Sequence, residues 1–158
     1  KQGPEAGAAQ APAGAKVMVI DDSNTIRRSA EIFLRQAGHQ VLLAEDGFDA
    51  LAKVNDHAPE LIFCDILMPR LDGYQTCAII KRNPRFAHVP VIMLSSKDGL
   101  FDKARGRMVG SQDYLTKPFT KEQLLRAVQM FGGAGPAVAP DAAPNAAPAT
   151  AQPTPFAE

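Results

Sequence analysis

Short runs of consecutive apolar residues recur through the middle of the chain, and longer segments with helical periodicity separate them. Three of the runs, at residues 17–20, 61–64 and 91–94, are uninterrupted and too short for a buried helix. Runs of this kind are typical of strands that are buried on both faces of a parallel sheet. Two more polar segments, at residues 40–44 and 113–115, predict two further strands.

The segments between these strands carry helix signals. Ser23 can cap the helix that follows the first strand, and Gly38 can end that helix in a left-handed conformation. Residues 48–54 have the pattern of a second helix. Two pairs with the spacing of a capping box predict the start of two later helices: Asp72 with Gln75, and Thr120 with Gln123. The apolar face of a further helix is predicted to consist of Phe101, Ala104 and Met108.

Five strands that alternate with helices predict an α/β fold, with a parallel sheet covered by helices on both faces. Right-handed crossovers between parallel strands require that arrangement. The segment that can fold in this way spans residues 16–131. Residues 1–15 and 132–158 are rich in Ala, Pro and Gly and almost lack large apolar side chains. We therefore expect a disordered N-terminal segment and a disordered Ala/Pro-rich tail.

Charge and composition exclude several classes of partner. Basic and acidic residues number 17 each, so no net charge favours nucleic acid or an anionic membrane. No apolar run approaches the roughly 18 residues of a membrane span, and no segment has the pattern of a signal peptide. Cys64 and Cys77 lie in apolar contexts and are interpreted as core residues in a reducing compartment. We expect a cytoplasmic protein that neither binds nucleic acid nor inserts into a membrane.

Polar side chains stand where the predicted strands end. Asp21 and Asp22 follow the first strand, and Asp65 follows the third. Ser95 ends the fourth strand, and Lys117 follows the fifth. If the first and third strands are neighbours, three carboxylates converge, and their repulsion needs a counter-charge. Mg²⁺, a hard cation that prefers oxygen ligands, would supply it, and the hydroxyl and the ammonium would suit a phosphoryl group.

These positions carry a resemblance to a known family. The residues that carry it are Asp21-Asp22, Asp65 with Met68-Pro69, Asp72-Gly73, Ser95 and Lys117-Pro118-Phe119. The set is similar to the receiver domain of two-component response regulators. The resemblance implies a doubly wound (βα)5 fold of the flavodoxin-like, CheY-like type, with strand order 2-1-3-4-5. Residues 21–28 and 91–119 resemble, more narrowly, PilG-type single-domain regulators of twitching motility driven by type IV pili.

The resemblance implies a role for each acidic residue. Asp65 would be the phosphoacceptor, which attacks the phosphohistidine of a partner kinase. Asp22 and Asp65 would bind Mg²⁺ directly, together with the backbone carbonyl of Leu67. Asp21 would act mostly through bound water. Phosphoryl transfer needs an in-line nucleophile and charge neutralisation more than it needs acid–base groups, and these residues supply both.

The remaining residues of the set would hold and sense the phosphoryl group. The resemblance implies that Ser95 Oγ and the Lys117 ammonium bind phosphoryl oxygens, and that the Lys117–Pro118 peptide is cis. Tyr114 stands at the position of the aromatic switch residue and would rotate toward Ser95 after phosphorylation. The surface formed by the fourth helix, fifth strand and fifth helix would then change its affinity for partners.

The resemblance also implies partners and kinetics. We expect a chemotaxis-like histidine kinase upstream, an effector protein that regulates the pilus downstream, and a monomer. The chain would be a signalling protein rather than an enzyme, and would catalyse only its own phosphoryl transfer and slow self-dephosphorylation. Leu67 and Lys97 stand where chemotaxis receivers often have polar or acidic side chains that orient the hydrolytic water. Their identity favours a long-lived phosphoryl group.

Two other hypotheses use the same residues. A receiver that acts as a phosphorylation-independent docking module is expected to have lost a residue of the acidic pocket, and none is lost here. An aspartyl-phosphate phosphatase would carry a second acid two positions after its nucleophile, where Leu67 stands.

Overall fold

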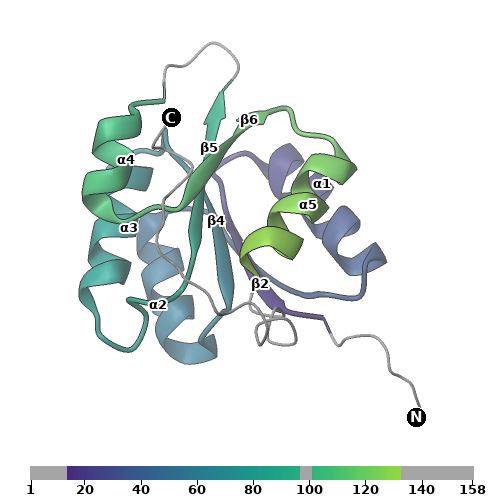
Figure 1. The fold of residues 1–158 in the computed structure, drawn as a ribbon, viewed down its shortest axis with the longest axis horizontal. Coiled ribbons are helices and arrows are strands. Elements are labelled where there is room, and N and C mark those ends of the chain that lie inside the picture. Colours follow the sequence, from purple (N-terminus) through teal and green to yellow (C-terminus); the bar gives the residue numbers. More distant parts are fainter. Residues whose placement is uncertain (1–13, 97–100, 133–158) are drawn as a thin grey trace.

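The computed structural model describes residues 14–96 and 101–132, which form a five-stranded parallel sheet with helices on both faces (Figure 1). The strands lie in the order β3-β2-β4-β5-β6, so the predicted order 2-1-3-4-5, counted along the chain, is confirmed. The elements in chain order are β2 (Lys16–Ile20), α1 (Asn24–Gln36), β3 (Gln40–Ala44), α2 (Gly47–His57), β4 (Leu61–Asp65), α3 (Gly73–Arg82), β5 (Val91–Ser96), α4 (Lys103–Val109), β6 (Asp113–Lys117) and α5 (Lys121–Phe131).

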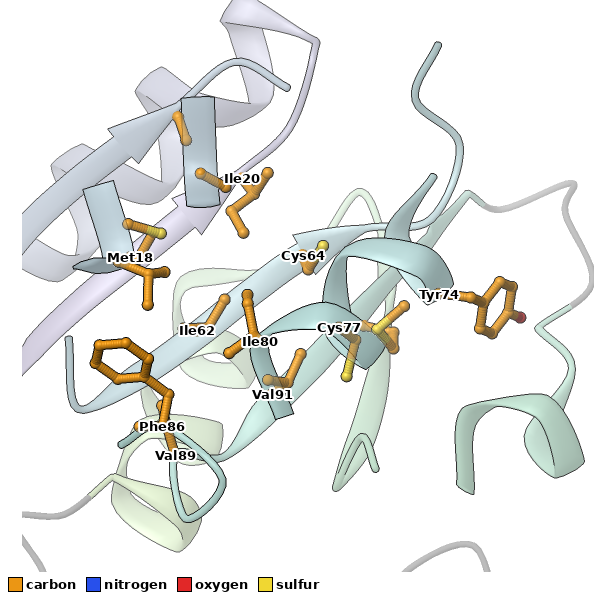
Figure 2. Packing of buried hydrophobic residues seen from close by; sticks show 14 of the residues in the cluster. Met18, Ile20, Ile62, Cys64, Tyr74, Cys77, Ile80, Phe86, Val89 and Val91 are labelled. Carbon is orange, nitrogen blue, oxygen red and sulfur yellow. The ribbon is translucent and has the colours of Figure 1, made fainter. Parts of the chain in front are cut away.

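Successive residues of the inner strands belong to two cores, one on each face of the sheet. In β2, Met18 and Ile20 pack in one cluster with α2 and α3, whereas Val17 and Val19 pack in the other with α1 and α5. Figure 1 shows α1 and α5 on one side of the sheet and α2, α3 and α4 on the other. Figure 2 shows the first cluster, in which side chains of α3 pack together with those of β2 and β4. Burial on both faces explains the uninterrupted apolar runs.

Local capping signals begin and end the helices as predicted. Ser23 Oγ accepts a hydrogen bond from the N–H of Ile26 at 3.3 Å, and Gly38 follows α1 with a φ of 90°. Both predicted capping boxes form, at Asp72 with Gln75 and at Thr120 with Gln123. Each box satisfies two backbone N–H groups that have no partner within the helix.

The prediction for the buried face of α4 is wrong. Phe101 precedes the helix instead of lying within it, Ala104 is exposed, and Met108 is 84% exposed. Gly106 is the buried residue of α4, and an ideal Cβ on it would lie 2.6 Å from Phe101 Cζ. The Phe101 ring therefore fills the space that a side chain at position 106 would need. Because that ring reaches the core from outside the helix, α4 turns a different face inward.

The expected terminal segments lie outside the described residues, apart from Gly14, Ala15 and Gly132. Lys97, which bears on the expected dephosphorylation rate, also lies outside them. Ala15 is only 1% exposed, and its N–H donates to His39 Nδ1 at 3.0 Å. Core packing therefore extends to Ala15, just ahead of the predicted boundary.

Both cysteines are free and buried, as expected for small core residues. Across residues 14–96 and 101–132, no helix is both long enough and apolar enough to cross a membrane.

The start of α3 lies directly against the end of β4, and a substitution tests that close approach. An ideal Cβ on Gly73 would lie 2.2 Å from the carbonyl oxygen of Asp65, a backbone atom that cannot rotate away. We predict that Gly73→Ala lowers the free energy of unfolding by about 2 kcal/mol or more, measured by urea denaturation.

Gly38→Ala is the matched control for this change. No atom lies within 4 Å of an ideal Cβ at Gly38, where φ is 90°, so its cost of about 1 kcal/mol comes from the backbone conformation alone. Equal losses in the two variants would show that the contact between α3 and β4 is not rigid.

Candidate functional site

The carboxyl ends of β2 and β4 bring three carboxylates together. The two strands are paired with Ile20 opposite Cys64, so the residues that follow them, Asp21 and Asp65, lie side by side. Carboxylate oxygens of Asp21, Asp22 and Asp65 all lie within 4.8 Å of one another. Asp21 and Asp65 are buried, with exposures of 0% and 4%, whereas Asp22 is exposed. The predicted convergence of the three acids is confirmed.

Lys117, at the end of β6, lies between the two buried acids. Its Nζ donates to Asp65 Oδ1 at 2.9 Å and to Asp21 Oδ2 at 3.0 Å. Burial alone would lower the pKa of the Lys117 ammonium, but the hydrogen bonds to Asp65 and Asp21 and the charges of these acids together raise that pKa above its usual value. Lys117 is therefore a permanent cation that both carboxylates share. The peptide between Lys117 and Pro118 is cis, as the resemblance implied.

The single ammonium does not neutralise the cluster. Burial and the charge of Asp21 raise the pKa of Asp65 to about 7, although Lys117 acts in the opposite direction. A carboxyl group with this pKa is substantially protonated near neutral pH unless another cation joins the site. The donor set consists of hard oxygen atoms with excess negative charge, which fits Mg²⁺.

Asp21 is the most firmly held of the three acids. Its Oδ1 accepts a hydrogen bond from the N–H of Ser23 at 2.8 Å, and its Oδ2 accepts the bond from Lys117. In the described part of the chain, no side chain pairs with Asp22. Asp22 is thus the carboxylate that is free to turn toward a cation, while Asp21 is fixed by the protein.

Three further residues were predicted to belong to the site: Ser95, Leu67 and Tyr114. Ser95 lies on β5, one residue beyond the partner of Asp65 in the strand register, and its Oγ contacts the carbonyl of Ser96 at 3.4 Å. Leu67 follows β4 and is 67% exposed. Tyr114 lies on β6 and packs against the core that includes α3.

Sequence reasoning missed two residues that shape the site. Arg27, which was assigned no role, donates from its guanidinium to the backbone carbonyl of Asp21 at 2.5 Å. The signal for it is weak, an arginine in the first turn of the helix that follows the acids. Phe101 was placed on the face of α4, but its ring stacks on Tyr114 with a centroid distance of 4.4 Å. No sequence pattern marks a contact of that kind.

Comparison with known proteins agrees with this geometry. The response regulator receiver domain family matches residues 17–129. Over 116 residues the chain is 68% identical to protein PilG of Pseudomonas aeruginosa, an alignment that covers 73% of this chain and 86% of PilG. It is 37% identical over 114 residues to protein PilH of the same organism, covering 72% of this chain and 94% of PilH.

A solved structure of a chemotaxis protein also matches this fold. Chemotaxis protein CheY4 of Vibrio cholerae superposes with a TM-score of 0.72 at 34% identity, covering 75% of this chain and 99% of CheY4. The family match, over residues 17–129, includes all three acids and Lys117. The chain belongs to the response regulator receiver domain family and is a receiver of the PilG type.

Proposed function

We propose that this chain is the phosphoacceptor of a two-component phosphorelay, phosphorylated on Asp65 by a chemotaxis-like histidine kinase with Mg²⁺, and that it controls twitching motility through type IV pili. A general role in two-component signalling follows from the family. The observation that carries the finer proposal is the buried position of Asp65 at the end of a central strand, where it shares one ammonium with a second buried acid. The identity with PilG supports the assignment to pili.

Asp65 is the best placed of the three carboxylates to act as the nucleophile. Asp21 uses one oxygen for the N–H of Ser23 and the other for Lys117. Asp65 uses Oδ1 for Lys117, and within the described residues no hydrogen bond ends on its Oδ2. That oxygen would form the new bond to phosphorus. The phosphorus–nitrogen bond of the phosphohistidine would break at the same time, and the imidazole would leave with its electron pair.

Asp22, Asp65 and the backbone carbonyl of Leu67 would hold Mg²⁺ directly, and Asp21 would act through bound water. Receiver domains bind Mg²⁺ at an acidic pocket, and the three carboxylates within 4.8 Å of one another provide one. The ion would neutralise charge on the carboxylates and on the phosphoryl group. A second cation also favours the ionised form of Asp65, which is the form that can attack.

Lys117 and Ser95 would hold the oxygens of the transferred group. The Lys117 ammonium is already 2.9 Å from Asp65 Oδ1, so a phosphoryl group on Asp65 would lie within its reach. The Ser95 hydroxyl makes a long contact of 3.4 Å with the Ser96 carbonyl. A bond of that length is weak, so the hydroxyl can exchange it for a charged phosphoryl oxygen at little cost.

The change in affinity for an effector protein would follow from the new charge at Asp65. A phosphoryl group adds close to two negative charges, which would draw Ser95 inward and let Tyr114 rotate toward it. The surface formed by α4, β6 and α5 would then bind a pilus-regulating effector protein with altered affinity. We propose that the protein acts as a cytoplasmic monomer, without contact to nucleic acid and without membrane insertion.

Phosphorylation can be tested directly by mass. Incubation with Mg²⁺ and acetyl phosphate should add about 80 Da, the mass of one phosphoryl group, to the intact chain. The gain should disappear in Asp65→Ala and on addition of a chelator. If the wild-type chain gains no mass and also fails to bind a beryllofluoride mimic, the docking-module hypothesis would be preferred.

The raised pKa of Asp65 predicts a pH-dependent gain in stability when its charge is removed. The pKa rises from an ordinary 3.8 to about 7 in the folded chain, so ionisation costs stability increasingly as the pH rises from 3.8 to 7. We predict that Asp65→Asn raises the free energy of unfolding by roughly 1 to 3 kcal/mol at pH 8 in the presence of a chelator. Urea denaturation measures this gain.

The gain should shrink as the pH falls toward 4, and Mg²⁺ should reduce it at pH 8 by stabilising the wild-type chain. Asp22→Asn is the control, because Asp22 is exposed and its removal should have a smaller effect. A gain that did not vary with pH would contradict the assignment of the effect to ionisation of Asp65.

The lifetime of the phosphoryl group tests the role of Leu67. Its exposure of 67% means that it can be replaced without loss of core packing. We predict that Leu67→Asn shortens the phosphoryl half-life several-fold, because an amide there can orient the hydrolytic water. The half-life is measured by the loss of mass after removal of the phosphodonor. Leu67→Ala, which adds no polar group, should not reproduce the effect, and an unchanged or longer half-life in Leu67→Asn would count against this account.

A further inference from the structure

Three aromatic rings form a row that joins α3 to β6. Tyr74 of α3 stacks on Phe101, which precedes α4, with a centroid distance of 6.1 Å and an interplanar angle of 20°. Phe101 stacks in turn on Tyr114 of β6, at 4.4 Å and 22°. Tyr114 is the proposed switch residue, so the row connects the switch to a helix that contributes no residue to the acidic pocket.

The hydroxyl group of Tyr74 holds the residue at which α4 begins. Tyr74 is 5% exposed, and its hydroxyl oxygen accepts a hydrogen bond from the N–H of Asp102 at 2.9 Å. Asp102 caps α4 through a bond from the N–H of Arg105 to its carboxylate, at 3.0 Å. Figure 2 shows the Tyr74 ring at the margin of the core cluster, with its hydroxyl pointing away from the other labelled side chains.

α4 depends on such an anchor because it has little stability of its own. It is seven residues long and contains Gly106, and its most exposed large apolar residue, Met108, contributes little to the core. A helix of that length is marginal in isolation, and an internal glycine weakens it further. The guanidinium of Arg105 lies 4.4 Å from the centre of the Tyr74 ring and 3.7 Å from Asp72. Tyr74 thus contacts the first turn of α4 with both its hydroxyl and its ring.

The observed contacts fit the arrangement expected before phosphoryl transfer. The Lys117 ammonium is bonded to both buried acids, and the Ser95 hydroxyl is turned to the Ser96 carbonyl. In the same arrangement Tyr114 stacks on Phe101. Rotation of Tyr114 toward Ser95 would break that stacking and remove one of the contacts that hold Phe101 ahead of α4.

We propose that Tyr74 is a positioning residue of the switch, whose hydroxyl stabilises the unphosphorylated arrangement by holding Asp102 and, through Phe101, Tyr114. The inference rests on the proposed phosphoacceptor function and adds to it a residue outside the acidic pocket. A bond made in only one of two conformations favours that conformation and opposes any ligand that prefers the other. Removal of the Tyr74 hydroxyl should therefore make a phosphoryl group easier to accept.

Tyr74→Phe removes the hydroxyl and keeps the ring. The full chain would be titrated with beryllofluoride in the presence of Mg²⁺ and followed by amide NMR shifts. We expect Tyr74→Phe to bind beryllofluoride about twofold to tenfold more tightly than wild type, the range that corresponds to one net hydrogen bond. Amide hydrogen exchange at Asp102 and Arg105 should also be faster in this variant, because α4 loses its anchor.

A control separates this role from a loss of stability. Val54→Ala, in the buried face of α2, should lower stability and leave the affinity for beryllofluoride unchanged. Unchanged or weaker affinity in Tyr74→Phe, with normal binding by wild type, would overturn the inference and leave the proposed function in place. Failure of the wild-type chain to bind beryllofluoride would overturn the proposed function, and this inference with it.

Discussion

The rest of the site depends on the two ion pairs that the Lys117 ammonium makes with Asp21 and Asp65. Two carboxylates buried at neighbouring strand ends repel each other strongly where water is excluded. The shared cation makes their proximity tolerable and ties the ends of β2, β4 and β6 together. One ammonium beside three carboxylates leaves the cluster with excess negative charge, and burial together with the charge of Asp21 raises the pKa of Asp65 to about 7. The excess of negative charge on hard oxygen atoms fits a cation such as Mg²⁺.

Stability for this arrangement comes from the two cores rather than from the site. The inner strands are buried on both faces, and their apolar side chains pack against helices on each side. The fold can therefore carry unfavourable charge at one edge of its sheet. The helix cover is uneven, however, because α4 is short and turns little apolar surface inward. This short helix begins two residues after Phe101, whose ring stacks on Tyr114.

The sequence was sufficient to predict the order of the elements and the edge at which the acids meet. Buried parallel strands leave uninterrupted apolar runs, and the capping boxes at Asp72 and Thr120 are local signals. It was not sufficient for contacts that depend on tertiary packing. Phe101 fills space at Gly106 from outside α4, and the long side chain of Arg27 folds back to the Asp21 carbonyl. Helical periodicity records neither contact, since both join residues through space rather than along a helix face.

The positions of Ala15 and Phe131, near the two ends of the folded domain, bear on how the domain can be attached to other proteins. Ala15 lies beside His39, just before β3. Phe131 lines the same pocket as Pro59 and Pro90, which precede β4 and β5. Both borders are therefore at the amino ends of the strands, opposite the edge that carries Asp65. A reporter protein or an immobilising tag joined at either border would leave the acidic edge open to a kinase.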